Sequence, residues 1–334
     1  MRGKNLCQLM AGFWSDVPFH PDLNLNDLNW HRRDGTLKLD HKELIKLLDA
    51  DTRTKLTAKS DRVGIKRLCS HFGWILVLGC YVAVGAPFWG LALFPLGICI
   101  IFLFTLLHET VHFTPFENPR LNIVVGHVCS VLVIVPNTFF RYFHLAHHKH
   151  TNDPLNDPEL ETPRPVTLND YLWHISGLPT WKATFVLMWQ QAKGDASAPY
   201  LPQKAEQTVV WQARWMFAVY GMAVVLIVAG WSWIFWCWLL PIIVGQPFLR
   251  LYLLAEHGLC PPVANMFENT RTTFTNRIIR FLAWNMPYHA EHHAYPAVPF
   301  HQLPAFHDLV KEQLVTTSDG YLKFHRDYAS KAAN

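Results

Sequence analysis

The chain has 334 residues, of which 51% are hydrophobic and 16% are charged, and its formal net charge is +4. Soluble domains typically carry about 25% charged residues, so this composition favours a membrane protein. The small net charge and the lack of a dense Lys/Arg patch argue against nucleic acid as a partner. The seven cysteines are scattered and lack C-x-x-C spacing, which argues against a disulfide framework or a zinc ribbon.

The N-terminal part, residues 1–67, is mostly polar and is expected to lie in the cytoplasm. Within it, HKELIKLLDADTRTKL at 41–56 has the apolar spacing of one amphipathic helix.

Two long apolar runs, residues 71–107 and 213–249, contain no Lys, Asp or Glu, and their one Arg is Arg214 at the start of the second run. Each run is about twice as long as the ~20 apolar residues that one spanning helix needs. Turn-forming residues lie near the middle of both runs, in GAP at 85–87 and GWSW at 230–233. Each run therefore predicts a transmembrane hairpin, and the chain is expected to be an all-α membrane protein with four spans.

All basic residues except Arg214, at the start of the second run, lie outside these two runs. Because Lys and Arg are enriched on the cytoplasmic side of membrane proteins, we expect both termini and the connection between the hairpins to face the cytoplasm. The protein is thus expected to be a multi-pass integral protein of the bacterial inner membrane or the endoplasmic reticulum.

A shorter apolar run at residues 121–136 is ambiguous, because it is short for a crossing and contains Asn122 and His127. A crossing there would place His112 and His144 on opposite sides of the membrane. We therefore expect this run to form a re-entrant or interface-lying helix.

Nine of the 19 histidines recur at short, regular spacings near the ends of apolar segments. HETVH has histidines at i and i+4, HLAHH and HAEHH have them at i, i+3 and i+4, and LAEHG adds one more. Residues at these spacings share one face of a helix, so each box is expected to aim its imidazoles at one point. The pattern predicts a metal site in a cytoplasmic helical cap, with the ligands His108, His112, His144, His147, His148, His257, His289, His292 and His293.

Nine imidazoles are too many for one zinc site, which closes with four ligands, but they suit two metals with four or five ligands each. Imidazole binds Zn, Cu, Fe and Ni, so the nitrogen ligands alone do not identify the metal. Among the remaining histidines, His71 and His307 are expected at a surface or an interface, and His127 is expected to be a hydrogen-bonded helix residue.

The order and spacing of HETVH, HLAHH and HAEHH, and their relation to the apolar hairpins, resemble the membrane fatty acid desaturase superfamily. AEHG resembles the extra ligand segment that precedes the third box in that superfamily. The resemblance covers roughly residues 70–310. RFLAWNMPYHAEHHAYPAVPFHQLP and the H-x3-H first box resemble the bacterial-type branch more than the acyl-CoA branch.

The resemblance implies a non-haem di-iron centre at the nine histidines, with O₂ as co-substrate and a fatty acyl or similar lipid chain as substrate. It implies hydrogen removal from an unactivated C–H bond, and a double bond as the product. Electrons are expected from a separate ferredoxin or cytochrome b5 type donor with its reductase, because no haem-binding HPGG segment is present in the sequence.

Other enzymes share these boxes, and the sequence leaves a hydroxylase, a carotenoid ketolase and a terminal-alkene-forming fatty acid decarboxylase open as alternatives. A membrane metal transporter is an alternative from another class. It is disfavoured because a transporter carries polar residues at mid-membrane depth, where the two long runs have no Asp, Glu, Lys, Arg or His.

Carboxylates adjoin the boxes, and TNDPLNDPE supplies more of them just after the second box. Ligating histidines usually donate their second ring N–H to a carboxylate or a carbonyl. A solvated acidic turn is the alternative reading of that loop. The residues expected to support the ligands are Glu109, Asp153, Asp157, Glu159, Glu256, Asn285 and Glu291.

The expected domain organisation has three parts. Residues 1–67 form a cytoplasmic N-terminal segment, residues 68–310 an integral-membrane desaturase-like domain with the boxes on its cytoplasmic side, and residues 311–334 a cytoplasmic tail.

Overall fold

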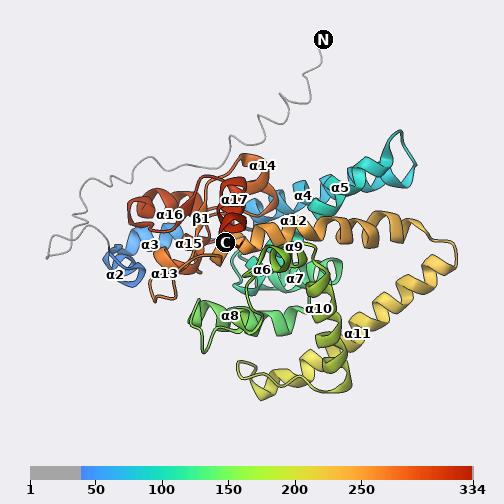
Figure 1. The fold of residues 1–334 in the computed structure, drawn as a ribbon, viewed down its shortest axis with the longest axis horizontal. Helices are drawn as coiled ribbons and strands as arrows, with labels where there is room; N and C mark the ends of the chain where they lie inside the picture. The colour runs from blue at the N-terminus through green and yellow to red at the C-terminus, as the bar shows by residue number, and fades with distance from the viewer. Residues whose placement is uncertain (1–38, 333–334) are drawn as a thin grey trace, which may run out of the picture. The chain divides into compact units, whose positions relative to one another are not determined.

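A computed structural model of the chain describes residues 39–332. Residues Asp40–Asn334 form one compact unit that is built almost wholly of helices (Figure 1). In chain order the elements are α2 (His41–Leu47), α3 (Ala50–Leu56), α4 (Asp61–Ala83), α5 (Trp89–Ile101), α6 (Leu103–Val111), α7 (Pro119–Val133), α8 (Asn137–His150), η2 (Pro158–Glu161), α9 (Leu168–Ile175), α10 (Leu178–Lys193), α11 (Gln203–Val228), η3 (Phe235–Leu239), α12 (Leu240–His257), α13 (Met266–Asn269), β1 (Thr272–Thr273), α14 (Arg277–Leu282), α15 (His289–Ala294), α16 (Leu303–Val310), η4 (Lys311–Gln313), β2 (Thr317–Ser318) and α17 (Tyr321–Ala332).

The expectation of a single helix over residues 41–56 is wrong, because the structure has two helices there, α2 and α3. The side chain of Asp40 begins α2 in a capping box with Glu43. The side chain of Asp49 accepts a hydrogen bond from the backbone N–H of Thr52 at 2.8 Å and begins α3. An Asp that accepts from the first turn stabilises a new helix start, so the second Asp interrupts the apolar pattern.

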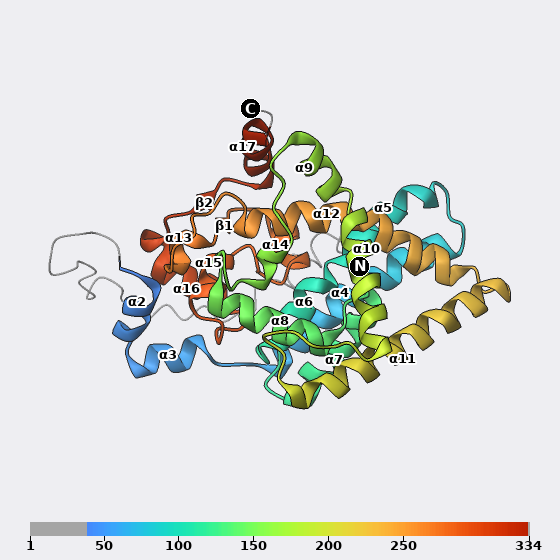
Figure 2. The ribbon, with the colours of Figure 1, turned by 60° about the horizontal axis from the view of Figure 1, so that its bottom comes forward.

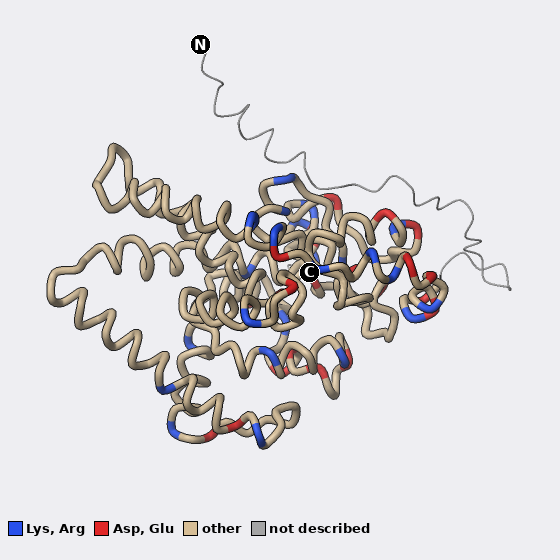
Figure 3. The backbone as a smooth tube through the Cα atoms, turned by 180° about the vertical axis from the view of Figure 1, so that it is seen from behind, with Lys and Arg blue, Asp and Glu red and all other residues tan. Residues whose placement is uncertain are grey.

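Four helical segments are long and apolar enough to cross a membrane, which confirms the expected all-α fold with two hairpins. They are Ala50–Ala83, Trp89–Val111, Gln203–Val228 and Phe235–His257. The tips of both hairpins carry no Lys, Arg, Asp or Glu (Figure 3). The expected domain boundary after residue 67 falls inside α4, and this three-part division stays a prediction.

Each hairpin turns at a glycine, as the sequence predicts. Gly85 follows α4 with φ +62°, and Gly230 follows α11 with φ +103°. Glycine adopts this left-handed backbone conformation without a Cβ clash, and it commonly ends helices for that reason. The chain can therefore reverse direction within a few residues.

Helices α7 and α8 form a bent pair instead of one span. Their axes differ by 99° across the break, where Ile134 takes a left-handed φ of 58°. The Nε2 atoms of His112 and His144, which flank this region, lie 2.9 Å apart. A full crossing between these residues would separate them by the ~30 Å hydrocarbon core, so the contact is incompatible with one.

Helices α5 and α12 cross at two glycines that allow their backbones to touch. A Cβ built on Gly245 would lie 2.3 Å from the carbonyl oxygen of Gly97. A Cβ built on Gly97 would lie 2.2 Å from the carbonyl oxygen of Pro241. Small residues at such crossings let membrane helices pack closely. The approach matters for the site because α12 ends at His257, while α5 leads through Phe102 into α6.

We expect Gly245→Ala to destabilise the protein by about 1–3 kcal/mol, because the added methyl overpacks the crossing. Gly221→Ala on α11 is the matched control, since a Cβ there meets nothing within 4 Å. Unfolding of the purified variants in detergent, followed by circular dichroism, measures the difference. Equal stability of the two variants would contradict the close crossing.

Candidate metal centre

The nine histidines of the boxes belong to four helices or the residues that end them, α6, α8, α12 and α15, and their rings lie close together. Figure 2 shows the ribbons of these four helices. Two of these helices stop at a histidine: His112 is the C-cap of α6, and His257 is the last residue of α12. The short helix α15 holds the whole third box, and every residue in it is buried.

A first group brings five imidazoles together. One ring nitrogen from each lies within 4.8 Å of the others. The Nε2 atoms of His112 and His148 each lie 2.9 Å from Nε2 of His144. Three nitrogens that face one another cannot all be paired by hydrogen bonds among themselves, so they point at a shared position. The group comprises His108, His112, His144, His148 and His292.

A second group contains His147, His257 and His293, again with ring nitrogens within 4.8 Å of one another. Nε2 of His257 lies 3.1 Å from Nε2 of His147 and 3.1 Å from Nε2 of His289. His289 therefore joins this group as its fourth imidazole.

The expectation that each box aims at a single point is wrong for the second and third boxes. His144 and His148 face the first group, whereas His147 faces the second. At 3.6 residues per turn, neighbouring residues on a helix are about 100° apart, so adjacent histidines in H-x-x-H-H point to different sides. His292 and His293 are divided between the groups in the same way.

The two groups are immediate neighbours. The ring of His148 stacks on that of His293 with 4.0 Å between centroids and 9° between planes. The ring centroids of His108 and His289 lie 5.9 Å apart. The two groups therefore form one continuous cluster of imidazoles.

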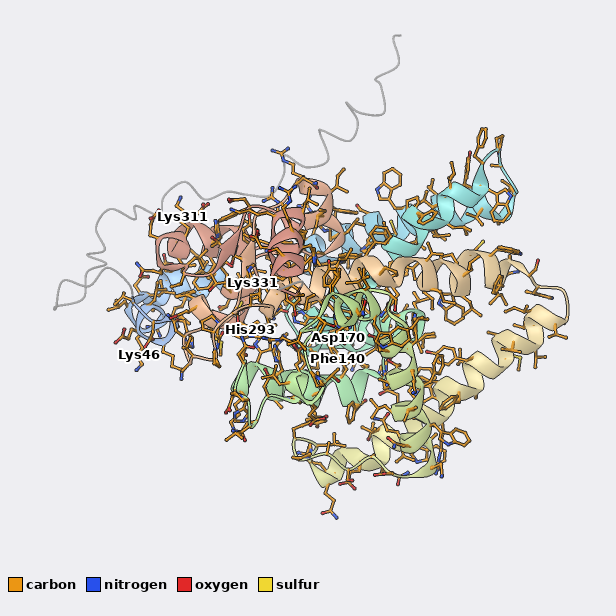
Figure 4. The ribbon with its side chains drawn as sticks, in the orientation of Figure 1. Lys46, Phe140, Asp170, His293, Lys311 and Lys331 are labelled. Carbon is orange, nitrogen blue, oxygen red and sulfur yellow. The ribbon has the colours of Figure 1, made fainter. Side chains whose placement is uncertain are left out.

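Burial favours the neutral form of the three imidazoles of the third box, whose lone pairs then stay available. His293 lies in the interior, whereas the labelled lysines Lys46 and Lys311 lie at the edge (Figure 4). Burial, together with the neighbouring His108 and His112, lowers the pKa of His292 well below its usual value. Burial and the imidazole of His148 do the same to the pKa of His293.

Several buried ring nitrogens of the site have no hydrogen-bond partner among the described residues. Both nitrogens of His108 and of His292 are in this position, as is Nε2 of His293. An unpaired buried polar atom costs roughly 1–3 kcal/mol, so a native structure needs a reason to keep several together. A bound cation is such a reason, and the donor set fits a pair of metal ions.

Carboxylates surround the two groups, and four of the expected ones approach a ring nitrogen. Nδ1 of His147 donates to Asp157 at 2.9 Å and lies 3.7 Å from Glu159. Nδ1 of His289 lies 3.3 Å from Glu256, and Nδ1 of His292 lies 3.6 Å from Glu109.

Asp157 makes the best-formed of these contacts. One of its oxygens also accepts from the backbone N–H of Glu159 at 3.0 Å, and the other from that of Asn152 at 2.7 Å. Burial alone would raise the pKa of Asp157, but the hydrogen bond and charge of His147, with these two backbone donors, lower it below its usual value. The carboxylate is therefore ionised and fixes which nitrogen of His147 carries the proton.

The other three expected supporting residues face other partners. Asp153 bonds within its own turn, to Leu155 and Asn156. The side chain of Asn285 donates to the carbonyl oxygen of Phe300 at 2.9 Å. The buried carboxylate of Glu291 hydrogen-bonds His307 and Thr272.

Three contacts near the site were not anticipated. The hydroxyl of Thr151 lies 3.0 Å from Nδ1 of His293. His307, expected at a surface or an interface, pairs with the buried Glu291. His71 is fully buried and bonds to the Cys99 carbonyl and the Trp284 indole, at 2.8 and 3.1 Å. Their partners are far away in the sequence, and no local pattern signals them.

A family model described as fatty acid desaturase matches residues 85–325, which include all nine histidines. The chain belongs to the fatty acid desaturase family. With its four apolar helices, it is a multi-pass membrane protein of that family. It is 23% identical over 227 residues to the sphingolipid delta(4)-desaturase DES1 of Drosophila melanogaster. This similarity covers 65% of the chain and 64% of the length of that protein, so the chain spans a little under two thirds of this relative.

We expect Asp157→Asn to weaken metal binding by about 10–100-fold, the usual loss when a partner of a ligating histidine is changed. The Asn amide would place an NH₂ group, itself a donor, opposite one of the N–H groups that now donate to the carboxylate, so one of these hydrogen bonds would be lost. Metal retained after dialysis against a graded chelator, measured by plasma mass spectrometry, gives the affinity. Asp153→Asn, in the same loop, is the control and should retain metal as the unchanged protein does.

Proposed function

We propose that the protein is an O₂-dependent, non-haem di-iron oxidoreductase that introduces a double bond into a fatty acyl or similar lipid chain. The observation that carries the proposal is the pair of adjacent, buried imidazole groups, with five and four members. Membership of the fatty acid desaturase family supports the reaction class, and the name of the sphingolipid desaturase relative supports a lipid as substrate.

The number of nitrogen donors supports iron over tetrahedral zinc. The five donors of the first group exceed the four ligands of a closed zinc site.

A di-iron centre, when bound, supplies the oxidising power that removes hydrogen from an unactivated methylene. The chain itself holds the ligands in place and keeps bulk water away, since eight of the nine imidazoles are buried. Asp157 keeps the proton of His147 on Nδ1, so that its Nε2 stays free to bind. Glu109 and Glu256 lie beside the Nδ1 atoms of His292 and His289, where each can orient its ring. Electrons come from a separate ferredoxin or cytochrome b5 type donor.

Product analysis tests the reaction class. The protein is expressed in a host with known lipids, and the fatty acids are analysed by mass spectrometry. A desaturase yields a chain lighter by two hydrogens, whereas a product that gains oxygen or loses its carboxyl carbon would contradict desaturation.

The purified protein should contain about two iron ions per chain, and His257→Ala should lose activity as severely as His148→Ala, because each removes a ligand from one group. His127→Ala is the control, since this histidine bonds Gln212 at 3.2 Å and belongs to neither group. Stoichiometric zinc without iron after iron-replete expression would contradict the proposal. So would full activity of the His257 variant.

We also propose that the metal centre and both termini face the cytoplasm, as the distribution of basic residues indicates. The terminal residues themselves lie outside the described part of the chain. Single cysteines in a cysteine-free background test this with a membrane-impermeant thiol reagent. Pro87→Cys and Trp231→Cys at the hairpin tips should react in intact cells. Glu117→Cys and Leu155→Cys should react only after permeabilisation, and labelling of Leu155→Cys from outside would overturn the orientation.

A further inference from the structure

Two arginines hold the ends of the two helices that stop at a ligating histidine. The first is Arg271, which is buried beside the end of α12. Its guanidinium donates to the carbonyl oxygens of Ala255 at 2.7 Å and Gly258 at 2.6 Å. Its backbone N–H donates to the carbonyl oxygen of Glu256 at 2.8 Å. These three carbonyls bracket His257, so a single residue holds the backbone on both sides of that ligand.

The second is Arg141, on α8 three residues before His144. Its guanidinium donates to the carbonyl oxygen of Val111, the last residue of α6. The next residue is His112, and after it comes Phe113 with a left-handed φ of 59°. Phenylalanine rarely adopts this conformation, which is strained because its Cβ crowds the backbone. Arg141 therefore holds the turn that presents His112 to the first group.

Each of the two guanidinium groups also lies over an aromatic ring. The guanidinium carbon of Arg271 lies 4.6 Å from the ring centroid of Phe324 on α17, and that of Arg141 lies 4.6 Å from the ring centroid of Phe113. A cation over an aromatic face is attracted to it, so each guanidinium is held between a ring and helix-end carbonyls.

The physical reason for this arrangement lies in the helix ends. The last carbonyls of a helix have no partner within it and carry the negative end of the helix dipole. When the final residue must ligate a metal, fraying of the last turn would displace the ligand. A planar guanidinium satisfies such carbonyls from a fixed direction, whereas the ammonium of lysine is a point charge on a flexible stem.

We propose that Arg141 and Arg271 are positioning residues, each fixing one ligand of a different metal: Arg141 fixes His112 in the first group, and Arg271 fixes His257 in the second. The proposal rests on the two-metal site of the proposed function. It assigns the two arginines separate effects, because the helices they hold end at different groups.

The test compares Arg141→Lys, Arg271→Lys and the unchanged full-length protein, each loaded with iron-57. Each substitution keeps the positive charge but removes the planar fork. We expect each variant to bind one of its two irons about 10–100-fold more weakly, the loss typical of a disturbed supporting contact. Iron retained against a chelator gives the affinity. Mössbauer spectra should show that the two variants perturb different iron signals.

Arg214→Lys is the matched control. Arg214 also donates to a helix-end carbonyl, that of Ala192 at 2.8 Å, and lies over an aromatic ring, that of Trp211 at 5.4 Å. No histidine of either group adjoins it in sequence. Its variant should keep both irons and both signals, which separates an effect on ligand position from a general loss of packing.

The outcomes distinguish this proposal from the proposed function. The proposed function is contradicted if the protein without substitutions binds no iron. The positioning role alone is contradicted if the unchanged protein binds two irons and both Lys variants also retain two irons and give the same Mössbauer spectrum. If Arg271→Lys does not purify as a folded protein, Phe324→Leu removes the ring beneath the guanidinium and keeps an apolar side chain. That variant should release one iron faster to the chelator, and release at the unchanged rate would overturn the proposal.

Discussion

The structure depends on one constraint: nine imidazoles, drawn from four helices, aim their ring nitrogens at two neighbouring points. The lone pairs of such nitrogens repel one another unless a cation lies between them. The helices α6, α8, α12 and α15 must therefore end at one level, and the connections must bring them there. The bent pair α7 and α8 meets this need, because it returns the chain towards His112 where a straight span would carry it away.

The close crossing of α5 and α12 follows from the same requirement. Gly97 and Gly245 let these helices touch, and the helices then continue to His112 and His257. Outside the imidazoles, buried carboxylates set the protonated nitrogen of particular rings, as Asp157 does for His147. Further out, arginines hold the carbonyls at the helix ends. The arginines thus restrict the helix ends, and the carboxylates restrict the imidazole rings.

This layered support also explains why so many ionisable groups lie beside a membrane-spanning region. The buried carboxylate of Asp157, for example, is compensated by His147 and by two backbone N–H groups. The tips of the hairpins carry no charged side chains, and the histidines lie at the opposite end of the hairpins.

The local patterns of the sequence determined the class of fold, the two hairpins with their glycine turns, and the histidines that meet, because apolar run length and imidazole spacing are properties of neighbouring residues. The tertiary structure alone decided how those histidines are shared. His147 and His148 are adjacent, yet they serve different groups, because their directions differ by about 100° around α8 and only the facing helices define where the two points lie. It also decided which acids support the clustered histidines. Asp153 and Asp157 look alike in the sequence, but Asp157 contacts His147 of the second group, whereas Asp153 bonds within its own turn. Pairs such as Glu291 with His307, or Arg271 with the end of α12, join segments whose approach depends on the packing of the whole chain, and no local pattern encodes that distance.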